Sequence, residues 1–383
     1  MIIQTQQELE ALCADLAQKP YITIDTEFLR DKTFYARLCL IQVAADGIDA
    51  HAIDPIATDL DWTSLNDLLH NEKVLKVFHA ARQDLEIFYQ MNGKIPSPIF
   101  DTQVAAMVCG YGDSIAYNRL VENITRTALA KNAQFTDWSR RPLADKQISY
   151  ALDDVTYLRD VYKSLDNQLK KQKRDHWVKE EMAILTNPDT YEMPVETIWK
   201  RIKIRSNKPE VLAVLRELAM WRELRAREKD IPRGRVIKDD ALADIATYMP
   251  KNVEGLRRIR SLNGDIAKGK LGKVIIERVQ KARKSPKDTW PTPPSKIPLT
   301  KSAIPTLEML KTLLKINCGQ ENVATKLIAN NDILEQLCLP KVPTDLSVLK
   351  GWRYEIFGKD ALDMKEGKLM IGLENGKIKK FYP

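Results

Sequence analysis

Hydrophobic and polar positions divide the chain into two unlike parts. In the first part, short apolar runs rich in β-branched residues precede or alternate with amphipathic segments, patterns typical of strands and helices respectively. The predicted strands are 21–28, 36–45, 47–54 and 74–80, and the predicted helices are 61–70, 81–91, 102–110, 117–129 and about 146–171. Strands that come first and then alternate with helices indicate a mixed β-sheet flanked by helices.

Beyond about residue 170 the strand pattern almost disappears. Helical patterns separated by Gly, Pro and Asn occupy 209–230, 239–249, 264–284 and 307–322. Residues 284–306 are basic and proline-rich, which is typical of an extended linker. Residues 367–383 predict a short hairpin that turns at Asn375-Gly376. The sequence therefore predicts an α/β domain followed by all-α modules.

Charge is distributed unequally between these parts. Residues 1–190 carry 21 Lys and Arg against 28 Asp and Glu, a net charge of −7. Subtracting these from the 60 and 52 of the whole chain leaves 39 and 24, or +15, for the remainder. Two explanations are open: the basic excess lies on solvated helix faces, or it contacts phosphates while the acidic part concentrates metal-binding carboxylates.

Length and composition exclude several classes of protein. A chain of 383 residues suggests two or three domains. No run of 18 apolar residues occurs, and the N-terminal "MIIQTQQELEAL" is too polar for a signal sequence, so we expect a soluble, cytoplasmic protein with no membrane partner. Five scattered cysteines without a C-x-x-C motif argue against disulfides or a zinc site, so we expect buried thiols.

The segment "YITIDTEFLR" places two acids in a strand that is otherwise apolar. Asp25 and Glu27 are two apart and point to the same face, whereas Ile22 and Ile24 face the other way. A hard divalent cation between the two carboxylates would relieve their repulsion. The alternative is an ordinary surface strand or strand end, so the prediction depends on whether further acids join the pair.

Two further segments supply such acids. Asp84, in "FHAARQDLEIF", lies in the first turns of a helix after a buried strand, where α/β sites are usually found, although a helix cap is an alternative. In "YALDDVTYL", Tyr150 and Asp154 are four apart and share a helix face, whereas we expect Asp153 to be solvated. The spacing alone is common by chance.

The ordered combination of D-x-E, a later Asp and Y-x-x-x-D resembles the three motifs of the DEDD 3′→5′ exonucleases in their tyrosine variant. His79 and Asp84 also have the spacing of the histidine variant, but they precede the separate Tyr150 and Asp154 pair and therefore belong to the second motif. The resemblance implies an RNase H-like mixed sheet.

Longer segments narrow the resemblance. "DTEFLRDKTFYARLCLIQVA", "IFDTQVAAMVCGYG" and "TDWSRRPLADKQISYALDDVTYLRDVY" resemble the ribonuclease D family, and "LRELAMWRELRAREKDIPRGRVIKDDALADIA" resembles its helical HRDC module. A weaker second copy of that module is suggested by "LKGWRYEIFGKDAL". The implied organisation is an exonuclease domain at 1–185, HRDC domain 1 at 206–286, a proline-rich linker at 287–304 and HRDC-like domain 2 at 305–383.

The family resemblance also implies a mechanism. Two divalent metal ions, Mg²⁺ or Mn²⁺, would be held by four acids, and one ion would activate the attacking water while the other stabilises the leaving 3′ oxygen. Tyr150 would orient that water. The implied metal ligands are Asp25, Glu27, Asp84 and Asp154, and these four with Tyr150 are the candidate catalytic residues.

Substrate contacts are less strongly indicated. Phe28 and Leu29 either pack against the terminal nucleobase or belong to the core, and Arg30, Arg37 and Gln42 are candidates for contacts with phosphate or ribose.

We expect an exoribonuclease that releases nucleoside 5′-monophosphates from RNA with a single-stranded 3′ end, including tRNA precursors. A single-stranded DNA exonuclease and a non-catalytic RNA-binding protein are alternatives, whereas the lack of a P-loop motif excludes a helicase. The sequence does not identify a protein partner.

Overall fold

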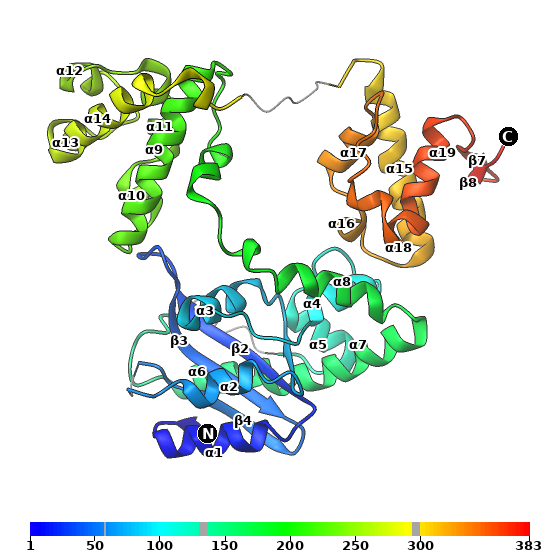
Figure 1. Cartoon of the computed structure of the whole chain (residues 1–383). Coiled ribbons are helices and arrows are strands. Elements are labelled where there is room, and N and C mark those ends of the chain that lie inside the picture. Colours follow the sequence, from blue (N-terminus) through cyan, green and yellow to red (C-terminus); the bar gives the residue numbers. More distant parts are fainter. Residues whose placement is uncertain (57–58, 130–135, 293–298) are drawn as a thin grey trace.

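The computed structural model describes residues 1–56, 59–129, 136–292 and 299–383. It begins with a six-stranded mixed sheet (Figure 1). The strands are β1 (Ile2–Ile3), β2 (Tyr21–Leu29), β3 (Arg37–Ala45), β4 (Ile48–Ile53), β5 (Leu75–Phe78) and β6 (Ile99–Asp101). Their order is β1-β4-β3-β2-β5-β6, in which β2 runs antiparallel to β3 and parallel to β5. This arrangement confirms the predicted mixed sheet.

Four of these strands agree with the apolar runs of the sequence, whereas β1 and β6 are missing from the prediction. Both are too short, at two and three residues, to produce a recognisable alternation. The two outer strands pair parallel with β4 and β5 respectively, so they depend on a tertiary contact and not on a local signal. The sheet is thus wider than its pattern indicates.

Eight helices accompany the sheet in the described residues 1–185: α1 (Gln6–Leu16), α2 (Thr63–Leu69), α3 (Arg82–Asn92), α4 (Thr102–Val108), α5 (Tyr117–Thr125), α6 (Asp145–Thr156), α7 (Leu158–Gln172) and α8 (Asp175–Leu185). The predicted long helix at 146–171 is therefore two helices. The Thr156 hydroxyl donates to the Leu152 carbonyl, 2.7 Å away, and such bonds to the preceding turn bend helices. Neither α1 nor α8 is among the predicted helices.

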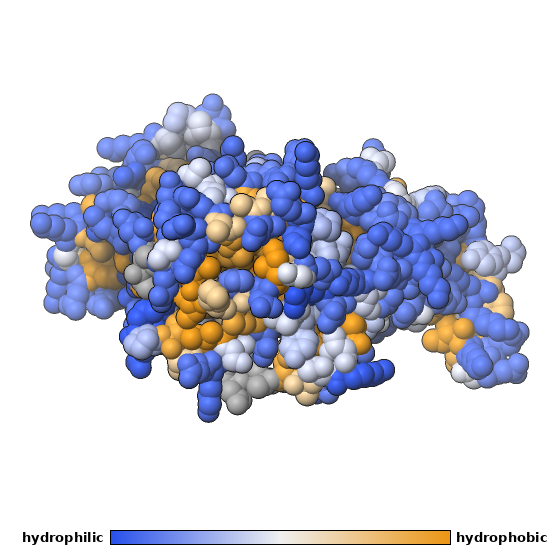
Figure 2. All heavy atoms as spheres, turned by 90° about the horizontal axis from the view of Figure 1, so that it is seen from below, coloured by the Kyte–Doolittle hydropathy of each residue, from blue (hydrophilic) through white to orange (hydrophobic). Residues whose placement is uncertain are grey.

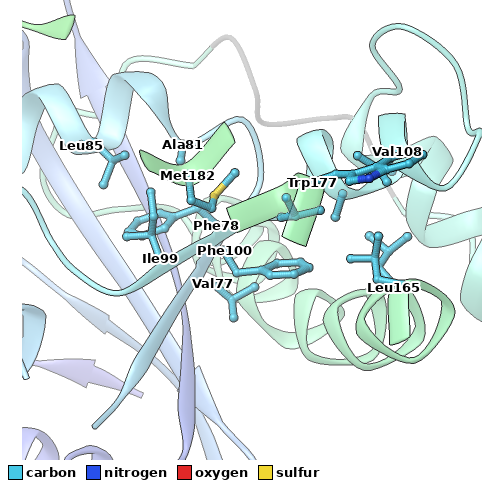
Figure 3. Close-up of a cluster of buried hydrophobic side chains, with 14 of the residues drawn as sticks. Val77, Phe78, Ala81, Leu85, Ile99, Phe100, Val108, Leu165, Trp177 and Met182 are labelled. Atoms are coloured by element: carbon cyan, nitrogen blue, oxygen red, sulfur yellow. The ribbon is translucent and has the colours of Figure 1, made fainter. Parts of the chain in front are cut away.

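The helix α8 completes the hydrophobic core on one side of the sheet. Figure 3 shows Trp177 and Met182 from α8 beside Phe78, Phe100 and Val108. These side chains are at most 8% exposed. The helix therefore belongs to the nuclease core although its polar first turn hides it in the sequence.

The next unit is helical and has a hydrophobic core of its own. A 3₁₀ segment at Val195–Arg201 leads into α9 (Pro209–Glu228), α10 (Arg233–Val236), α11 (Asp239–Tyr248), α12 (Val253–Arg257), α13 (Gly264–Lys268) and α14 (Lys270–Lys284). The predicted helix 264–284 is interrupted at Gly269, where the backbone is extended. A Cβ at Gly272 would lie 2.1 Å from the Ala267 carbonyl oxygen. The close approach of α14 to α13 therefore requires a glycine at position 272.

The C-terminal part contains α15 (Ala303–Glu321), α16 (Thr325–Ile328), α17 (Asn331–Leu337), α18 (Gly351–Arg353), a π-helical turn at Tyr354–Gly358, α19 (Lys359–Lys365) and a hairpin of β7 (Met370–Glu374) and β8 (Lys377–Phe381). The hairpin turns at Asn375 and Gly376, both with positive φ, which confirms its prediction. The middle of the predicted linker, residues 293–298, lies outside the described residues.

The C-terminal helices share one continuous hydrophobic core with the nuclease domain, whereas the preceding helical unit does not. In Figure 1 the two helical groups lie apart from each other, and both lie on the same side of the sheet domain. The sequence predicts a further helical module at 305–383, and the helices α15–α19 lie in it. Part of their apolar surface is buried against α4 and α8 of the nuclease domain.

The face seen in Figure 2 is mostly hydrophilic, with scattered hydrophobic patches. One patch lies at its right-hand end, where Figure 1 places the hairpin β7–β8. All five cysteines are free and buried, as predicted. Among the described residues, no helix is both long and apolar enough to cross a membrane.

Candidate active site

The acid pair lies on the central strand β2. Asp25 is opposite Gln42 of β3, and Glu27 is opposite Leu40, with an irregularity in the pairing immediately after Glu27. Helix α6 packs over this face of the sheet, where the Thr23 hydroxyl donates to the Val155 carbonyl at 2.8 Å. The strand thus aims both carboxylates at α6, and only the last part of the strand leaves the buried core.

The helix α6 supplies the partners predicted for the pair. Oxygen atoms of Asp25, Glu27 and Asp154 lie within 4.8 Å of one another. Tyr150, one turn before Asp154, has its hydroxyl beside the Asp154 carboxylate, and its ring lies 6.2 Å from that of Trp138. The structure therefore brings together three of the four predicted acids and the predicted tyrosine.

The segment that contains Trp138 is fixed by Arg141. The Arg141 guanidinium binds the Asp54 carboxylate with two contacts of 2.6 Å and also donates to the carbonyls of Trp138 and Cys39, each at 2.8 Å. This connects the loop before α6 to β3 and to the end of β4. The "DWSRRP" segment thus holds Trp138 beside the ring of Tyr150.

Asp84 occupies the first turn of α3 and is 6% exposed. Its carboxylate accepts a hydrogen bond from the Thr26 hydroxyl, and it lies outside the group of three that share 4.8 Å. Its charge nevertheless raises the pKa of Glu27. Asp84 is therefore at the margin of the cluster and is held by Thr26, which lies between Asp25 and Glu27.

The turn before Asp84 is shaped by a buried carboxylate. Asp101, 3% exposed, accepts hydrogen bonds from the backbone N–H groups of Ala80, Ala81 and Gln103 at 2.8–2.9 Å. Ala80 has a φ of 60°, a left-handed conformation that costs an alanine strain. The three hydrogen bonds stabilise this conformation, which carries the chain from β5 into α3 and sets the start of that helix.

A cavity of about 400 Å³ opens over the cluster. Several of its residues were not predicted as part of the site. Tyr117 donates to the Asp154 carbonyl at 2.6 Å, and His79 lies 2.9 Å from the Thr102 hydroxyl through Nδ1. Asp153, expected to be solvated, also lines the cavity. The lining residues are Asp25, Thr26, Glu27, His79, Ala116, Tyr117, Asn118, Leu129, Tyr150, Asp153, Asp154 and Leu158.

Burial and mutual repulsion favour the protonated forms of these acids. Burial raises the pKa of Asp25 to about 7. Burial and then the charge of Asp25 raise the pKa of Asp154 to about 9, and burial followed by the charges of Asp25, Asp154 and Asp84 raises that of Glu27 to about 10. The pKa of Tyr150 is raised by burial and then by Asp154, so its hydroxyl stays neutral. A bound cation would offset this concentration of negative charge.

The donor set fits a hard divalent cation. Three carboxylates offer oxygen atoms within 4.8 Å of one another, and oxygen ligands of this kind are preferred by Mg²⁺ and Mn²⁺. No His or Cys in the described residues joins this group, so a zinc-like ligand set does not form here. The cluster can therefore hold divalent metal.

The candidate substrate residues divide into three kinds. Phe28 and Leu29 are partly buried, and Leu29 packs against the apolar cluster beneath α6. Arg30 forms a two-point ion pair with Glu86, with distances of 2.7 and 2.8 Å, whereas Arg37 is exposed. Gln42 is fully buried, so the expected direct contact between Gln42 and substrate does not agree with the structure.

A second, larger cavity lies between the nuclease domain and the first helical unit. Phe34, in the loop between β2 and β3, packs beneath the guanidinium groups of Arg227 and Arg233, 5.7 and 4.6 Å from its ring centroid. The backbone N–H groups of Phe34 and Tyr35 donate to Asp230 at 3.0 Å. The strand that carries the acid pair is thus connected directly to α9 and α10.

Comparison with known families defines the class of the protein. A family profile described as 3′-5′ exonuclease matches residues 1–170, and the HRDC domain profile matches residues 211–279. Together with the mixed sheet and its acidic cavity, these matches define a 3′→5′ exonuclease domain followed by a helical HRDC region. They confirm the predicted fold class, while the second HRDC-like copy stays a prediction.

Relatives of known family narrow this class further. Ribonuclease D of Bartonella henselae is 45% identical over 378 residues, which cover 99% of this chain and 93% of the relative. Ribonuclease D of Nitrobacter hamburgensis is 47% identical over 378 residues, 98% of each chain. The crystal structure of Escherichia coli RNase D superimposes with a TM-score of 0.84 at 28% identity and covers 96% of this chain and 98% of that one. The chain therefore belongs to the ribonuclease D family and is a metal-dependent 3′→5′ exoribonuclease.

Proposed function

We propose that the chain trims RNA from its 3′ end, including tRNA precursors and other stable RNAs, and releases nucleoside 5′-monophosphates. The observation that carries this proposal is the convergence of Asp25, Glu27 and Asp154 within 4.8 Å, beside Tyr150 and in an open cavity. Escherichia coli RNase D is described as an exoribonuclease involved in structured RNA processing, which supports a structured substrate.

We propose that two Mg²⁺ or Mn²⁺ ions are held by Asp25, Glu27, Asp84 and Asp154. When bound, such a pair lowers the pKa of the attacking water and neutralises charge on the phosphate and on the leaving 3′ oxygen. The Thr26 hydroxyl donates to Oδ1 of Asp84, so Oδ2 is the oxygen that we propose as the metal ligand.

The chain's own residues orient the reactants. Tyr150 remains a neutral hydroxyl because burial and Asp154 raise its pKa, so it acts by hydrogen bonding and not as a general base. We propose that it positions the attacking water, while Trp138 fixes its ring. Phe28 and Leu29, which follow the acid pair, are the proposed apolar contacts of the terminal nucleobase, with Arg30 and Arg37 nearby.

The remaining domains are proposed to hold the body of the RNA. We assign the exonuclease domain to 1–185, HRDC domain 1 to 206–286, a linker to 287–304 and an HRDC-like domain to 305–383. The net charge of +15 beyond residue 190 favours contact with RNA phosphates. Because Phe34 connects the first of these helical domains to β2, RNA bound there is held near the catalytic strand.

A cleavage assay tests this function. The full chain is incubated with a 5′-labelled tRNA precursor, or with single-stranded DNA of equal length, in Mg²⁺, Mn²⁺ or chelator, and the released products are identified by chromatography. We expect stepwise shortening of the RNA from its 3′ end, nucleoside 5′-monophosphates, and no cleavage with chelator. Preferential degradation of DNA would instead favour a DNA exonuclease, and metal-independent binding without cleavage a non-catalytic protein.

A further inference from the structure

Gln42 is the least satisfied buried group next to the acid cluster. Its side chain is 0% exposed, and neither Nε2 nor Oε1 has a hydrogen-bond partner among the residues that the structure describes. An amide buried without partners destabilises the folded chain, so such groups are rare and usually have a function. The proposed mechanism leaves Gln42 without a role, since its burial prevents contact with RNA.

The register of the sheet places this amide beside one particular carboxylate. Gln42 of β3 is directly opposite Asp25 of β2. Residues that face each other across an antiparallel pair project from the same side of the sheet, with Cβ atoms about 4.5–5.5 Å apart. The Gln42 side chain is long enough to span that separation. A change of rotamer therefore suffices to bring its N–H groups to the Asp25 carboxylate.

The other residues on this face give the amide little alternative. On β3 the neighbours two positions away are Leu40 and Ala44, and the residue opposite on β4 is Ala52. All three are apolar and fully buried. The Thr23 hydroxyl, also on this face, already donates to the Val155 carbonyl. Glu27, opposite Leu40, is only a diagonal neighbour, so Asp25 is the polar group directly opposite Gln42.

We infer that Gln42 is a positioning residue that donates a hydrogen bond to the Asp25 carboxylate when the site binds a divalent cation. Carboxylates that ligate metals are themselves held by hydrogen bonds, and loss of such a bond typically weakens metal binding by about 10–100-fold. Without a cation the amide has no partner, and with one it fixes the orientation of a ligand. The inference rests on the proposed function for the identity of the cation.

The test compares two variants of buried residues in the full chain. Gln42→Met keeps the length and volume of the side chain but removes its donors. Thr23→Val is the matched control, since it removes a buried hydrogen bond to α6 on the same sheet face. The residue opposite Thr23 is Ala44 and not a carboxylate. Mn²⁺ affinity is measured by isothermal titration calorimetry without RNA, and cation-free melting temperatures by circular dichroism.

For Gln42→Met we expect Mn²⁺ affinity to fall about tenfold or more, with an unchanged or higher melting temperature in the absence of cation. For Thr23→Val we expect the reverse, a lower melting temperature and unchanged affinity. In cleavage assays Gln42→Met should lower kcat and leave KM for RNA unchanged, because the residue does not touch substrate.

Two results would overturn the inference. The first is wild-type Mn²⁺ affinity in Gln42→Met, which would leave the amide without a role toward the cation. The second is a lower cation-free melting temperature of that variant, which would show that the amide has a stabilising partner in the absence of metal. If the wild-type chain shows no specific Mn²⁺ binding, the proposed metal site itself is wrong. The same conclusion follows if Asp25→Asn binds Mn²⁺ as tightly as the wild type.

Discussion

The indole rings of Trp177 and Trp352 stack with their centroids 4.4 Å apart and their planes at 10°. Arg174 covers the outer face of this pair on the Trp177 side at 4.5 Å, and Arg353 covers Trp352 at 4.4 Å. Both tryptophans are buried. One belongs to α8 and the other to α18, so the stack fastens the C-terminal helices to the nuclease domain.

We expect Trp352→Ala to destabilise the chain by about 3 kcal/mol or more, the usual cost of removing a large buried aromatic side chain. The lost contacts join two parts of one hydrophobic core, so limited proteolysis should also become faster near α15–α19. Chemical denaturation gives the change in unfolding free energy. The exposed Glu355→Ala is the control and should change it by less than about 0.5 kcal/mol. Equal stability of both variants would mean that the docking is marginal.

We expect Asp25→Asn and Asp154→Asn to abolish metal-dependent cleavage and to leave the protein folded. Each change removes a charged oxygen ligand from the cluster but keeps the side-chain volume. Cleavage of labelled RNA and circular dichroism are the measurements. Activity retained by either folded variant would exclude the replaced residue as an essential metal ligand.

Tyr150→Phe should lower the rate of cleavage within the roughly 10²–10⁴-fold range of groups that handle protons in a transition state. The ring and its packing against Trp138 remain, so the loss isolates the hydroxyl. Single-turnover kinetics give the rate, and calorimetry should show an unchanged affinity for Mn²⁺. A variant with wild-type speed would reduce Tyr150 to a structural role.

Stability without cation should fall as pH rises. Folding raises the pKa of Asp25 to about 7, of Asp154 to about 9 and of Glu27 to about 10, mainly through burial. Unfolded carboxyl groups titrate near pH 4, so between about pH 4 and 10 the folded chain binds more protons than the unfolded chain. The unfolding free energy therefore decreases with pH across this window.

We accordingly expect a lower melting temperature at pH 8.5 than at pH 5.5 in the presence of chelator, measured by calorimetry or circular dichroism. Saturating Mn²⁺ should raise the melting temperature more at pH 8.5, because the ligands are then closer to their ionised form. Asp25→Asn should weaken the pH dependence, whereas Asp240→Asn, at an exposed position in α11, should not. If the wild type, Asp25→Asn and Asp240→Asn show the same pH dependence of stability, that dependence does not arise from Asp25.

Phe34→Ala should impair the binding of folded RNA much more than the cleavage of short oligonucleotides. It removes the ring beneath Arg227 and Arg233 and so loosens the HRDC region from β2. We expect hydrolysis of short oligonucleotides to change only a few-fold, while affinity for a folded tRNA precursor and the steepness of its salt dependence both decrease. Fluorescence anisotropy at several salt concentrations measures both quantities.

Phe34→Tyr keeps an aromatic ring and is the matched control for this prediction. Substitution is preferable to removal of the helical domains, because truncation after α8 would expose the buried surface around Trp177. If Phe34→Ala binds folded RNA with the affinity and salt dependence of Phe34→Tyr, the contact with the HRDC region does not help to hold RNA.

The sequence predicts features that have a local signature. Asp25 and Glu27 are conspicuous because they interrupt an apolar alternation, and Tyr150 and Asp154 because they share a helix face. The features it does not predict depend on contacts between distant segments. Tyr117, at the start of α5, reaches the cavity from a segment distant in sequence from the acids, and His79, directly after β5, is conspicuous in the sequence only for its spacing from Asp84. The separation of α6 from α7 at Tyr157 likewise has no Gly or Pro to mark it in the sequence.

The stacked tryptophans also have a consequence for synthesis of the chain. Trp177 and Trp352 are 175 positions apart, and the HRDC region lies between them. At translation speeds of about 5–20 residues per second, roughly 10–35 s pass before the second tryptophan leaves the ribosome. During that interval the apolar surface of α4 and α8 remains uncovered, because the C-terminal helices that bury it have not yet been synthesised.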